Sequence, residues 1–338
     1  MTVLERGRLT CGPLVERFEK AFAQFVGSVH AICVNSGSSA NLLLMAALGL
    51  QPGDQVLVPV LTWPTTVAPV IQLGLKPVWI DADPRTFQMD MEEANQELNH
   101  DIRAVWVAHL MGNAVDLDNL QVPNGTILLE DCCEGFGTFY GGRHVGTSGL
   151  AGTFSFFMTH QLMTGEGGMI VTDEADLAAK LRRMRSHGWD RADEQASFNF
   201  PDLGFNFRPT ELTGIWGSQQ LDAWPEASLR RNELAMAMSG ILGVEAMTIT
   251  AGTSPAPFAW PVRSKRRLEI TKALNEAGVE TRPLLGGNLL RNSAFRDFGV
   301  AAEFPVADAL GREAFYWPCH QGMSDEDAAW IREIVEHA

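Results

Sequence analysis

An aspartate at the end of an apolar segment is the first residue with a position suited to chemistry. Asp131 closes the segment 127–131, ILLED, which has the length and composition of a buried strand. Ligands of parallel sheets gather at the carboxyl ends of the strands, and a carboxylate there can form a charge-assisted hydrogen bond with a protonated ring nitrogen. The other interpretation is that Asp131 caps a helix that follows the strand.

Small and hydroxyl residues in two other places could bind a phosphate group. The segment NSGSSAN, with Gly37 and Ser38, follows a predicted strand over 30–34 and opens a predicted helix. Glycine permits close backbone approach, and the exposed amides of a helix N-terminus suit a phosphate. Ser155, in GTFSFF, lies between apolar residues where another strand is predicted to end. The alternatives are an ordinary capping turn at the first place and a buried core hydroxyl at the second.

An indole and an imidazole complete the set. Trp63, in VLTWPTT, follows a predicted strand over 55–60, where an indole can stack on an aromatic ring; as one of nine tryptophans it could equally be a core residue. His160, in FFMTHQLMTGEGG, could move protons near neutral pH, although an isolated histidine is more often packed or on the surface. The GEGG turn over 165–168 is predicted to be structural, because glycine allows a sharp turn before the next strand.

The composition limits the partners of these residues. The chain of 338 residues has a formal net charge of −15, which makes it a poor electrostatic partner for nucleic acid or for an anionic membrane. No apolar run approaches the roughly 18 residues of a transmembrane helix, and the first residues lack the apolar core of a signal peptide, so we expect a cytoplasmic protein. The five cysteines are scattered and form no CxxC pair, so we expect reduced thiols and no metal site.

Strand-like and helix-like segments alternate through the first two thirds of the chain. Apolar runs such as HAICV, QVLVPV, PVWID, AVWVAHL and GMIVTD are separated by helical stretches such as MEEANQELN. This alternation predicts an α/β fold with a mainly parallel sheet and helices on both faces. Helical patterns follow over 209–224 and 225–242, and beyond residue 243 short strands (AMTIT, FAWPV) flank another helix. We predict a large domain over residues 1–225 and a smaller C-terminal α+β domain over 226–338.

In this order, the segments NSGSSAN, LTWPTT, LLEDCCEGFG, FSFFMTHQLMTGEGG and FNFRPTEL resemble those of the DegT/DnrJ/EryC1/StrS sugar aminotransferase family. The resemblance covers nearly the whole chain and implies the aspartate-aminotransferase-type fold (fold type I), with pyridoxal phosphate as cofactor. In ordinary members, the residue six before the glutamate of GEGG is the lysine that holds the cofactor covalently. Here the residue six before Glu166 is His160, and none of the five lysines lies in a matching motif.

A histidine at this position marks a subgroup of the family, the 4-keto-6-deoxy-sugar 3-dehydratases. The chain resembles the GDP-linked type in local features such as EDCCE, SHGWDR and the late CHQ. The CDP-linked type also carries the histidine but adds an iron–sulfur cluster, held by cysteines beyond GEGG. A cluster normally needs four thiolates. Because only Cys319 lies beyond Cys133, we expect no iron–sulfur cluster.

The resemblance implies how the cofactor would be held. Asp131 would pair with the pyridine nitrogen, Trp63 would stack on the ring, and Glu134 would lie near the ring hydroxyl. The phosphate would be bound by four residues, the last of them contributed across a homodimer with a shared active site: Gly37, Ser38, Ser155 and Asn206.

The resemblance also implies a reaction. Pyridoxal or pyridoxamine phosphate would bind without a covalent link, and the C3 hydroxyl of a nucleotide-linked 4-keto-6-deoxy sugar would be removed. His160 would act as the base, since imidazole has an ordinary pKa of about 6.5. Glutamate would be the amine donor that regenerates the cofactor. The residues expected to contact the substrate are His187, Arg208, Arg282 and His320.

Two other functions stay open from the sequence. A sugar aminotransferase would use a lysine in an unusual place, and a non-catalytic relative would have kept the fold without the reaction. The retained residues Asp131, Trp63 and Glu134 argue against the second, because a relative without activity has no reason to keep a complete cofactor shell. The chain is also shorter than is usual in the family, mainly at the N-terminus, between 191 and 205, and in the small domain.

Overall fold

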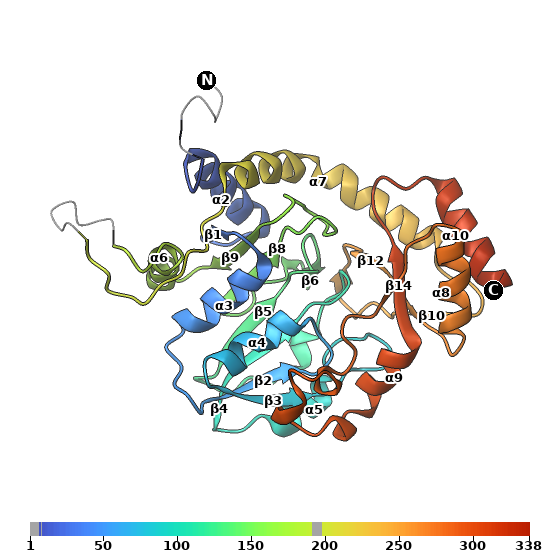
Figure 1. Ribbon diagram of the computed structural model, residues 1–338, viewed down its shortest axis with the longest axis horizontal. Coiled ribbons are helices and arrows are strands. Elements are labelled where there is room, and N and C mark those ends of the chain that lie inside the picture. Colours follow the sequence, from blue (N-terminus) through green and yellow to red (C-terminus); the bar gives the residue numbers. More distant parts are fainter. Residues whose placement is uncertain (1–6, 8, 191–197) are drawn as a thin grey trace.

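The computed structural model describes residue 7, residues 9–190 and residues 198–338, and is built around a seven-stranded sheet (Figure 1). The strand order is β1-β9-β8-β5-β4-β2-β3. The strands are β1 (His30–Val34), β2 (Gln55–Pro59), β3 (Lys76–Ile80), β4 (Ile102–Ala108), β5 (Ile127–Asp131), β8 (Ala151–Ser155) and β9 (Gly168–Thr172). All pairings are parallel except those that β9 makes with β1 and β8. The predicted mainly parallel sheet is therefore confirmed.

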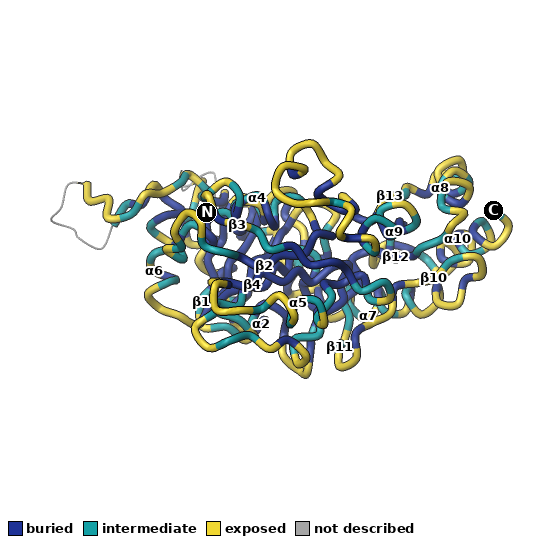
Figure 2. The backbone as a smooth tube through the Cα atoms, turned by 90° about the horizontal axis from the view of Figure 1, so that it is seen from below, coloured by how far each residue is buried: buried dark blue, intermediate teal, exposed yellow. Residues whose placement is uncertain are grey.

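The strands of this sheet are buried, which explains why they are apolar runs in the sequence. In β4, for example, Arg103 is the one exposed residue of the seven. Sheets covered on both faces favour such continuous apolar strands. Figure 2 shows the buried backbone through the centre of the molecule, with the exposed segments around it. The surrounding helices are α2 (Pro13–Val26), α3 (Gly37–Ala47), α4 (Pro64–Gln72), α5 (Met91–Glu97) and α6 (Ala175–Met184).

Helix α2 packs against the first part of the long helix α7 (Glu211–Ala237). The buried face of α2 carries Phe18 and Phe22, whose rings contact aromatic residues of β8 and of the segment after it. Gly214 and Gly217 of α7 permit this contact, because a Cβ on Gly217 would lie 2.4 Å from the ring of Phe18. This packing fixes α7 beside the segment that follows β8.

Two smaller sheets complete the structure. The antiparallel sheet β10-β12-β14-β13 consists of β10 (Glu245–Ala246), β12 (Ala259–Arg263), β14 (Ala314–Pro318) and β13 (Arg282–Pro283). The sheet β11-β6-β7 consists of β11 (Thr253–Ser254), β6 (Phe139–Tyr140) and β7 (Arg143–His144). The late helices are α8 (Arg267–Glu276), α9 (Pro305–Glu313) and α10 (Asp325–His337), and the short 3₁₀ turns are η1 (Leu117–Asn119), η2 (Leu289–Arg291), η3 (Arg296–Phe298) and η4 (Ala301–Glu303).

The strand expected in AMTIT is shorter than predicted. Pairing with β12 ends at Ala246, because the backbone amide of Thr248 donates instead to the carbonyl of Arg85. Helix α9 and strand β14 had no counterpart among the predicted elements. The predicted helical patterns over 209–224 and 225–242 form one continuous helix, α7, with Pro225 inside it.

Helix α7 runs across the molecule from the large sheet to the sheet that contains β14 (Figure 1). The domain boundary predicted at residue 225 falls within this helix, and the division of the chain into 1–225 and 226–338 stays a prediction. No helix of the described residues is both long and apolar enough to cross a membrane. Part of the shortened stretch between 191 and 205 lies outside the described residues.

Candidate active site

Asp131, the last residue of β5, has a carboxylate with three hydrogen-bond donors. Its Oδ2 accepts from Asn41 Nδ2 and from Thr66 Oγ1, both at 2.8 Å, and its Oδ1 accepts from the backbone N–H of Cys133 at 3.0 Å. A carboxylate can accept about four hydrogen bonds, so these three leave capacity for one more on Oδ1. No helix begins in residues 132–138, so the interpretation of Asp131 as a helix cap is wrong.

Gly37 begins α3 in close contact with the end of β8. A Cβ on Gly37 would lie 2.5 Å from Cβ of Ser155 and 2.9 Å from Sγ of Cys133, so only glycine lets the start of the helix approach this closely. Ser38 Oγ is 2.8 Å from Thr65 Oγ1 on α4. Three of the four residues predicted to bind the phosphate, Gly37, Ser38 and Ser155, therefore lie around one helix N-terminus, where backbone amides favour an anion.

Helix α3 links this helix start to Asp131. Asn41 lies four residues after Gly37, so both residues are on the same side of α3. Asn41 is fixed in turn by Thr153 of β8, whose Oγ1 donates to Asn41 Oδ1 at 2.6 Å. The anion-binding helix start and the acidic group are therefore parts of one rigid arrangement.

Trp63 is the N-cap residue of α4 and is 57% exposed, so the interpretation as a core tryptophan is wrong. The residues that follow it bond to both parts of the site: Thr65 to Ser38, and Thr66 to Asp131. An exposed indole at this place can stack on a flat ring held between them.

His160 lies half-buried in the loop between β8 and β9. Its Nδ1 is 3.3 Å from the carbonyl oxygen of Ser155, and its ring meets the ring of Phe258 edge-on, with 5.1 Å between centroids. Burial lowers the pKa of His160 to about 4, although the backbone carbonyls of Ser155 and Cys133 and the charge of Asp131 act in the opposite direction. The imidazole is therefore neutral near pH 7 and able to accept a proton.

Glu134 lies in the turn after β5, on the same side as His160. Its Oε2 accepts a hydrogen bond from the backbone N–H of Met111 at 3.0 Å. Burial, reinforced by the charge of Asp131, raises the pKa of Glu134 to about 7. Met111 has φ of +59°, which is uncommon for a residue other than glycine. Glu134 can therefore hold or release a proton near neutral pH, and the residue that donates to it, Met111, is kept in an uncommon conformation.

Three predicted residues lie together on a different part of the surface. Arg208 Nη1 is 2.7 Å from His187 Nε2, and both residues line a cavity of about 1020 Å³ that also contains Arg182. Asn206 is exposed and pairs with Ser186 in an isolated bridge beside them. The residues around Asp131 do not line this cavity.

The last two predicted substrate residues lie near the ends of β13 and β14. Arg282 is exposed and forms an ion pair with Glu280. His320 follows β14, and its pKa is lowered by partial burial and by the charge of Arg231. Neither makes a hydrogen bond to Asp131, Glu134 or His160 in the described part of the chain. Arg282 is nevertheless paired with Tyr316 across the small sheet, and the charge of Glu134 helps burial to raise the pKa of Tyr316 to about 12.

Several residues of the site were missed in the sequence. Asn41 and Thr66 hold Asp131, Gln161 holds the turn of Glu134, and Phe258 contacts His160. A signal existed for the first two, because each is a polar residue next to the apolar part of its predicted helix, and buried polar residues are usually satisfied by a specific partner. No local pattern marks Phe258, which is 98 residues away from His160.

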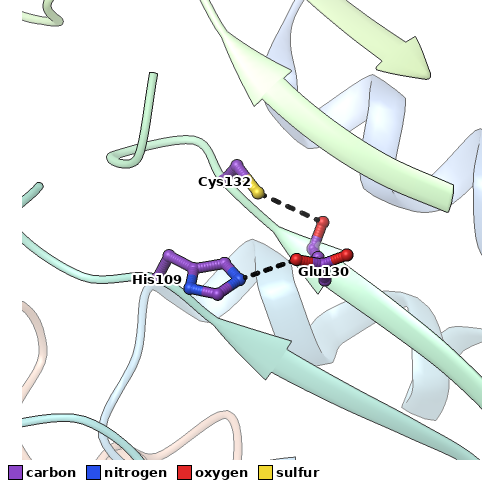
Figure 3. Close-up of side chains that lie close together, drawn as sticks. All are labelled: His109, Glu130 and Cys132. Carbon is purple, nitrogen blue, oxygen red and sulfur yellow. Dashed lines mark hydrogen bonds and ion pairs between the residues drawn. The ribbon is translucent and has the colours of Figure 1, made fainter. Parts of the chain in front are cut away.

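A second group of polar side chains lies on the other side of β5, where His109, Glu130 and Cys132 could in principle hold a metal ion (Figure 3). Glu130 Oε1 accepts from the backbone amides of Ser148 and Gly149, and Oε2 accepts from Gly146 N and from His109 Nε2. The backbone amide of Val115 donates to His109 Nδ1, which makes Nε2 the protonated nitrogen. Burial raises the pKa of the Cys132 thiol well above its ordinary value. Among the described residues, the group is a buried hydrogen-bond cluster in which Glu130 is the central acceptor.

The comparisons with known proteins give the chain its family. The model of the DegT/DnrJ/EryC1/StrS aminotransferase family matches residues 1–336. The chain is 32% identical over 368 residues to a GDP-4-keto-6-deoxy-D-mannose 3-dehydratase of Escherichia coli O55:H7, covering 99% of this chain and 95% of the relative. It is also 32% identical to a GDP-perosamine synthase of Caulobacter vibrioides, covering 94% of this chain and 87% of the relative.

A solved structure agrees with both the fold and the relatives. A GDP-4-keto-6-deoxymannose-3-dehydratase with a trapped PLP-glutamate geminal diamine superposes with a TM-score of 0.93 at 30% sequence identity, covering 98% of this chain and 95% of that one. The aspartate-aminotransferase-type fold implied by the sequence is confirmed. The chain belongs to the DegT/DnrJ/EryC1/StrS aminotransferase family.

Proposed function

We propose that the protein is a dehydratase that removes the C3 hydroxyl of a nucleotide-linked 4-keto-6-deoxy sugar with a non-covalently bound pyridoxamine or pyridoxal phosphate. One observation carries the proposal: the residue at the position of the family's lysine is His160, whose Nδ1 is 3.3 Å from the carbonyl oxygen of Ser155, and none of the lysines bonds to this part of the described chain. Four of the five lysines are exposed, at positions 20, 76, 265 and 272. The fifth, Lys180, donates through Nζ to the carbonyl of Ala47.

The described residues fit the cofactor. A protonated ring nitrogen suits the open position on Asp131 Oδ1, and the helix start at Gly37, where a Cβ would meet Ser155, suits the phosphate. Trp63 offers an exposed face for the ring. When bound, the cofactor supplies an amine for the sugar ketone and a conjugated system that accepts electrons.

His160 would move the proton. Nδ1 faces the carbonyl of Ser155 and so carries a hydrogen, which leaves Nε2 as the nitrogen that accepts a proton. The rings of Phe157 and Phe258 flank the imidazole, each meeting it edge-on. Once protonated, an imidazole whose pKa is lowered to about 4 is a stronger acid than an ordinary imidazolium, so the same group can pass its proton to the departing hydroxyl.

The substrate and donor follow from the relatives. The E. coli relative is named for a GDP-linked keto sugar, and the solved structure contains a PLP-glutamate adduct. We therefore propose a GDP-linked sugar as substrate and glutamate as donor. Arg208 and His187, which line a large cavity, are candidates to bind the nucleotide phosphates. Arg282 and His320, near the ends of β13 and β14, are further candidates to contact the substrate.

A homodimer that shares its active sites is part of the proposal. Large apolar side chains are exposed on the loop of His160 and on the adjoining part of α7: Phe157, Met158, Met163, Leu212 and Trp216. Contiguous exposed apolar surface of this kind favours burial by a partner. A second copy there would bring its own Asn206 toward the helix start at Gly37.

An aminotransferase is the second candidate, since the GDP-perosamine synthase of C. vibrioides is equally identical to this chain. The deciding experiment supplies the protein with pyridoxamine phosphate, glutamate and a panel of nucleotide-linked 4-keto-6-deoxy sugars, and follows the products by mass spectrometry. We expect loss of the C3 oxygen with release of ammonia. A product with a new amine at C4 and an intact C3 hydroxyl would identify a transferase, and no cofactor binding at all would identify a non-catalytic relative.

A single substitution tests the position of His160 independently of the substrate. His160→Lys should attach the cofactor covalently, which borohydride reduction and intact-mass measurement detect as an added pyridoxyl group. The unchanged protein treated in the same way should keep its mass. Covalent labelling of the unchanged protein on a lysine would contradict the dehydratase proposal.

A further inference from the structure

Gln161, the residue directly after His160, is a buried amide with an uneven set of partners. Its side chain is 2% exposed. Nε2 donates to the carbonyl of Glu134 at 2.6 Å and to the carbonyl of Ala256 at 3.1 Å, while Oε1 has no partner among the described residues. Because both partners are acceptors, the amide cannot be turned around without placing Oε1 against two carbonyl oxygens. The orientation of Gln161 is therefore fixed.

The unpaired Oε1 of Gln161 lowers the stability of the folded protein. A buried acceptor without a donor destabilises the folded protein, and an apolar side chain of similar shape would avoid that loss. An unsatisfied buried group in a native protein calls for an explanation. The explanation lies in the two hydrogen bonds that Nε2 donates, because they join separate segments of the site.

The first bond reaches the turn that carries Glu134, and the second reaches the segment that carries Phe258. The loop of His160 is thereby tied to the backbone of Glu134 on one side and to the wall that covers the imidazole on the other. The ring of Phe258 meets the ring of His160 at 80° and 5.1 Å. Gln161 therefore joins the loop of His160 to the segments that carry the other two side chains.

The segment 256–258 is also fixed from the other directions. Arg231 of α7 donates through Nη1 to the carbonyls of Pro257 and Phe258. The backbone amides of Ala256 and Phe258 donate to the carbonyls of Gly112 and Met111. The same Met111 donates its own amide to Glu134. Gln161 is thus the only described side chain that joins this rigid segment to the loop of His160 by a hydrogen bond.

We propose that Gln161 is a positioning residue, which fixes His160 relative to Glu134 and Phe258 so that the imidazole reaches the reacting carbon. The proposal rests on the proposed function for the meaning of that geometry. Misplacing a catalytic group by about 1 Å can cost about 10²-fold in rate, so a loss of both bonds should lower kcat far more than it changes the KM of the sugar.

The chain offers a matched control. Gln220 of α7 also forms two hydrogen bonds with this loop, accepting from Met163 N at 3.1 Å and donating to Met163 O at 2.7 Å. These bonds are exposed and lie away from Glu134 and Phe258. Gln161→Met and Gln220→Met therefore remove the same number of hydrogen bonds from one loop, and only the first removes the tie to His160's neighbours.

The test combines kinetics with a measurement on the cofactor-free protein. We expect Gln161→Met to lower kcat at least tenfold with less than a threefold change in sugar KM, and Gln220→Met to change both less than threefold. In the cofactor-free protein, the titration midpoint of His160, assigned by NMR with His160→Asn as reference, should rise in Gln161→Met, because a displaced Phe258 admits water. The charged groups that act on His160, Asp131 of β5 and Arg231 of α7, are unchanged in both variants.

Equal effects of the two substitutions would overturn the proposal, and so would an unmoved His160 titration in Gln161→Met. Should Gln161→Met fail to fold, Gln161→Asn keeps the amide but is too short to reach both carbonyls, and the same two measurements apply to it. The titration needs no cofactor or substrate, so it fails only with the positioning role. A product that retains its C3 oxygen in the unchanged enzyme would instead contradict the proposed function alone.

Discussion

Two neighbouring carboxylates at the end of β5 have opposite surroundings. Glu130 accepts four hydrogen bonds, three of them from backbone amides, and its side chain is fully buried. Asp131 accepts three, which leaves it one short of the four that a carboxylate can accept. Since a carboxylate accepts about four hydrogen bonds, the first group is complete within the protein and the second is not. Residue type alone does not separate a structural acid from a functional one, whereas the count of its partners does.

The largest loss of activity should come from replacing His160. His160→Asn keeps a polar side chain of similar size but removes the group that accepts a proton. We expect kcat for dehydration to fall about 10²- to 10⁴-fold, the usual contribution of a general base. Cofactor affinity, measured by the change in absorbance on titration with pyridoxamine phosphate, should change less than threefold. A variant that keeps its kcat would remove His160 from the reaction.

Glu130→Gln tests the role of the buried hydrogen-bond cluster around Glu130. The amide would place an N–H group against backbone amides that now donate to Glu130, and a buried charged cluster would lose its anion. We expect the free energy of unfolding to fall by about 3 kcal/mol, measured by urea denaturation. The activity per folded molecule should stay within twofold. A large loss of kcat at full stability would mean that this cluster takes part in catalysis and that the comparison is wrong.

Asp131→Asn should give the reverse pattern. The side chain keeps its size, but Oδ1 can no longer form a charge-assisted bond with a protonated ring nitrogen. Such bonds are worth about 1.5–3 kcal/mol, so cofactor affinity should fall roughly 10- to 150-fold, while the unfolding free energy changes less than in Glu130→Gln. Thr66→Val is the matched control, because it removes one donor to Asp131 and leaves the charge. Equal cofactor affinity in Asp131→Asn and the unchanged protein would contradict the assigned role.

The difference between the two carboxylates also explains what the sequence could predict. The parallel sheet and the edge at which Asp131 lies follow from apolar segments of strand length, because strand and helix periodicity are local properties. The identity of His160 as the unusual residue depended on a family resemblance and not on periodicity. Gly37 and Ser155 were found separately, and their contact became visible only in three dimensions.

The partners of these residues could not be predicted, because they come from distant segments. Asp131 accepts hydrogen bonds from Asn41 of α3 and Thr66 of α4, and Asn41 accepts in turn from Thr153 of β8. A single sequence carries no record of such pairs. The same holds for the pKa of His160, which depends on burial beneath Phe258. The sequence singled out Asp131 by its place at the strand end and gave no sign of the role of Glu130 beside it.

The pH dependence of kcat is the smallest and most specific effect that separates the cluster around Glu130 from the site around Asp131. Burial and the charge of Asp131 raise the pKa of Glu134 to about 7, so its proton is present below pH 7 and lost as the pH rises through that value. Ionisation places a second negative charge beside Asp131 and the ring hydroxyl of the cofactor, so kcat should decline severalfold above about pH 7. On the acid side, protonation of His160 removes the base only near pH 4.

Glu134→Gln should keep the acid limb and abolish the decline above pH 7, because the amide cannot ionise. Glu130→Gln should leave both limbs in place, since the pKa of Glu130 is lowered by its hydrogen bonds with His109 and the backbone amides, against its burial. The measurement is a profile of kcat from pH 4 to 9 for the three proteins in one buffer series. If the alkaline limb persists in Glu134→Gln, the titrating group lies elsewhere. If it moves in Glu130→Gln, the two sides of β5 are coupled, which their separate hydrogen-bond sets argue against.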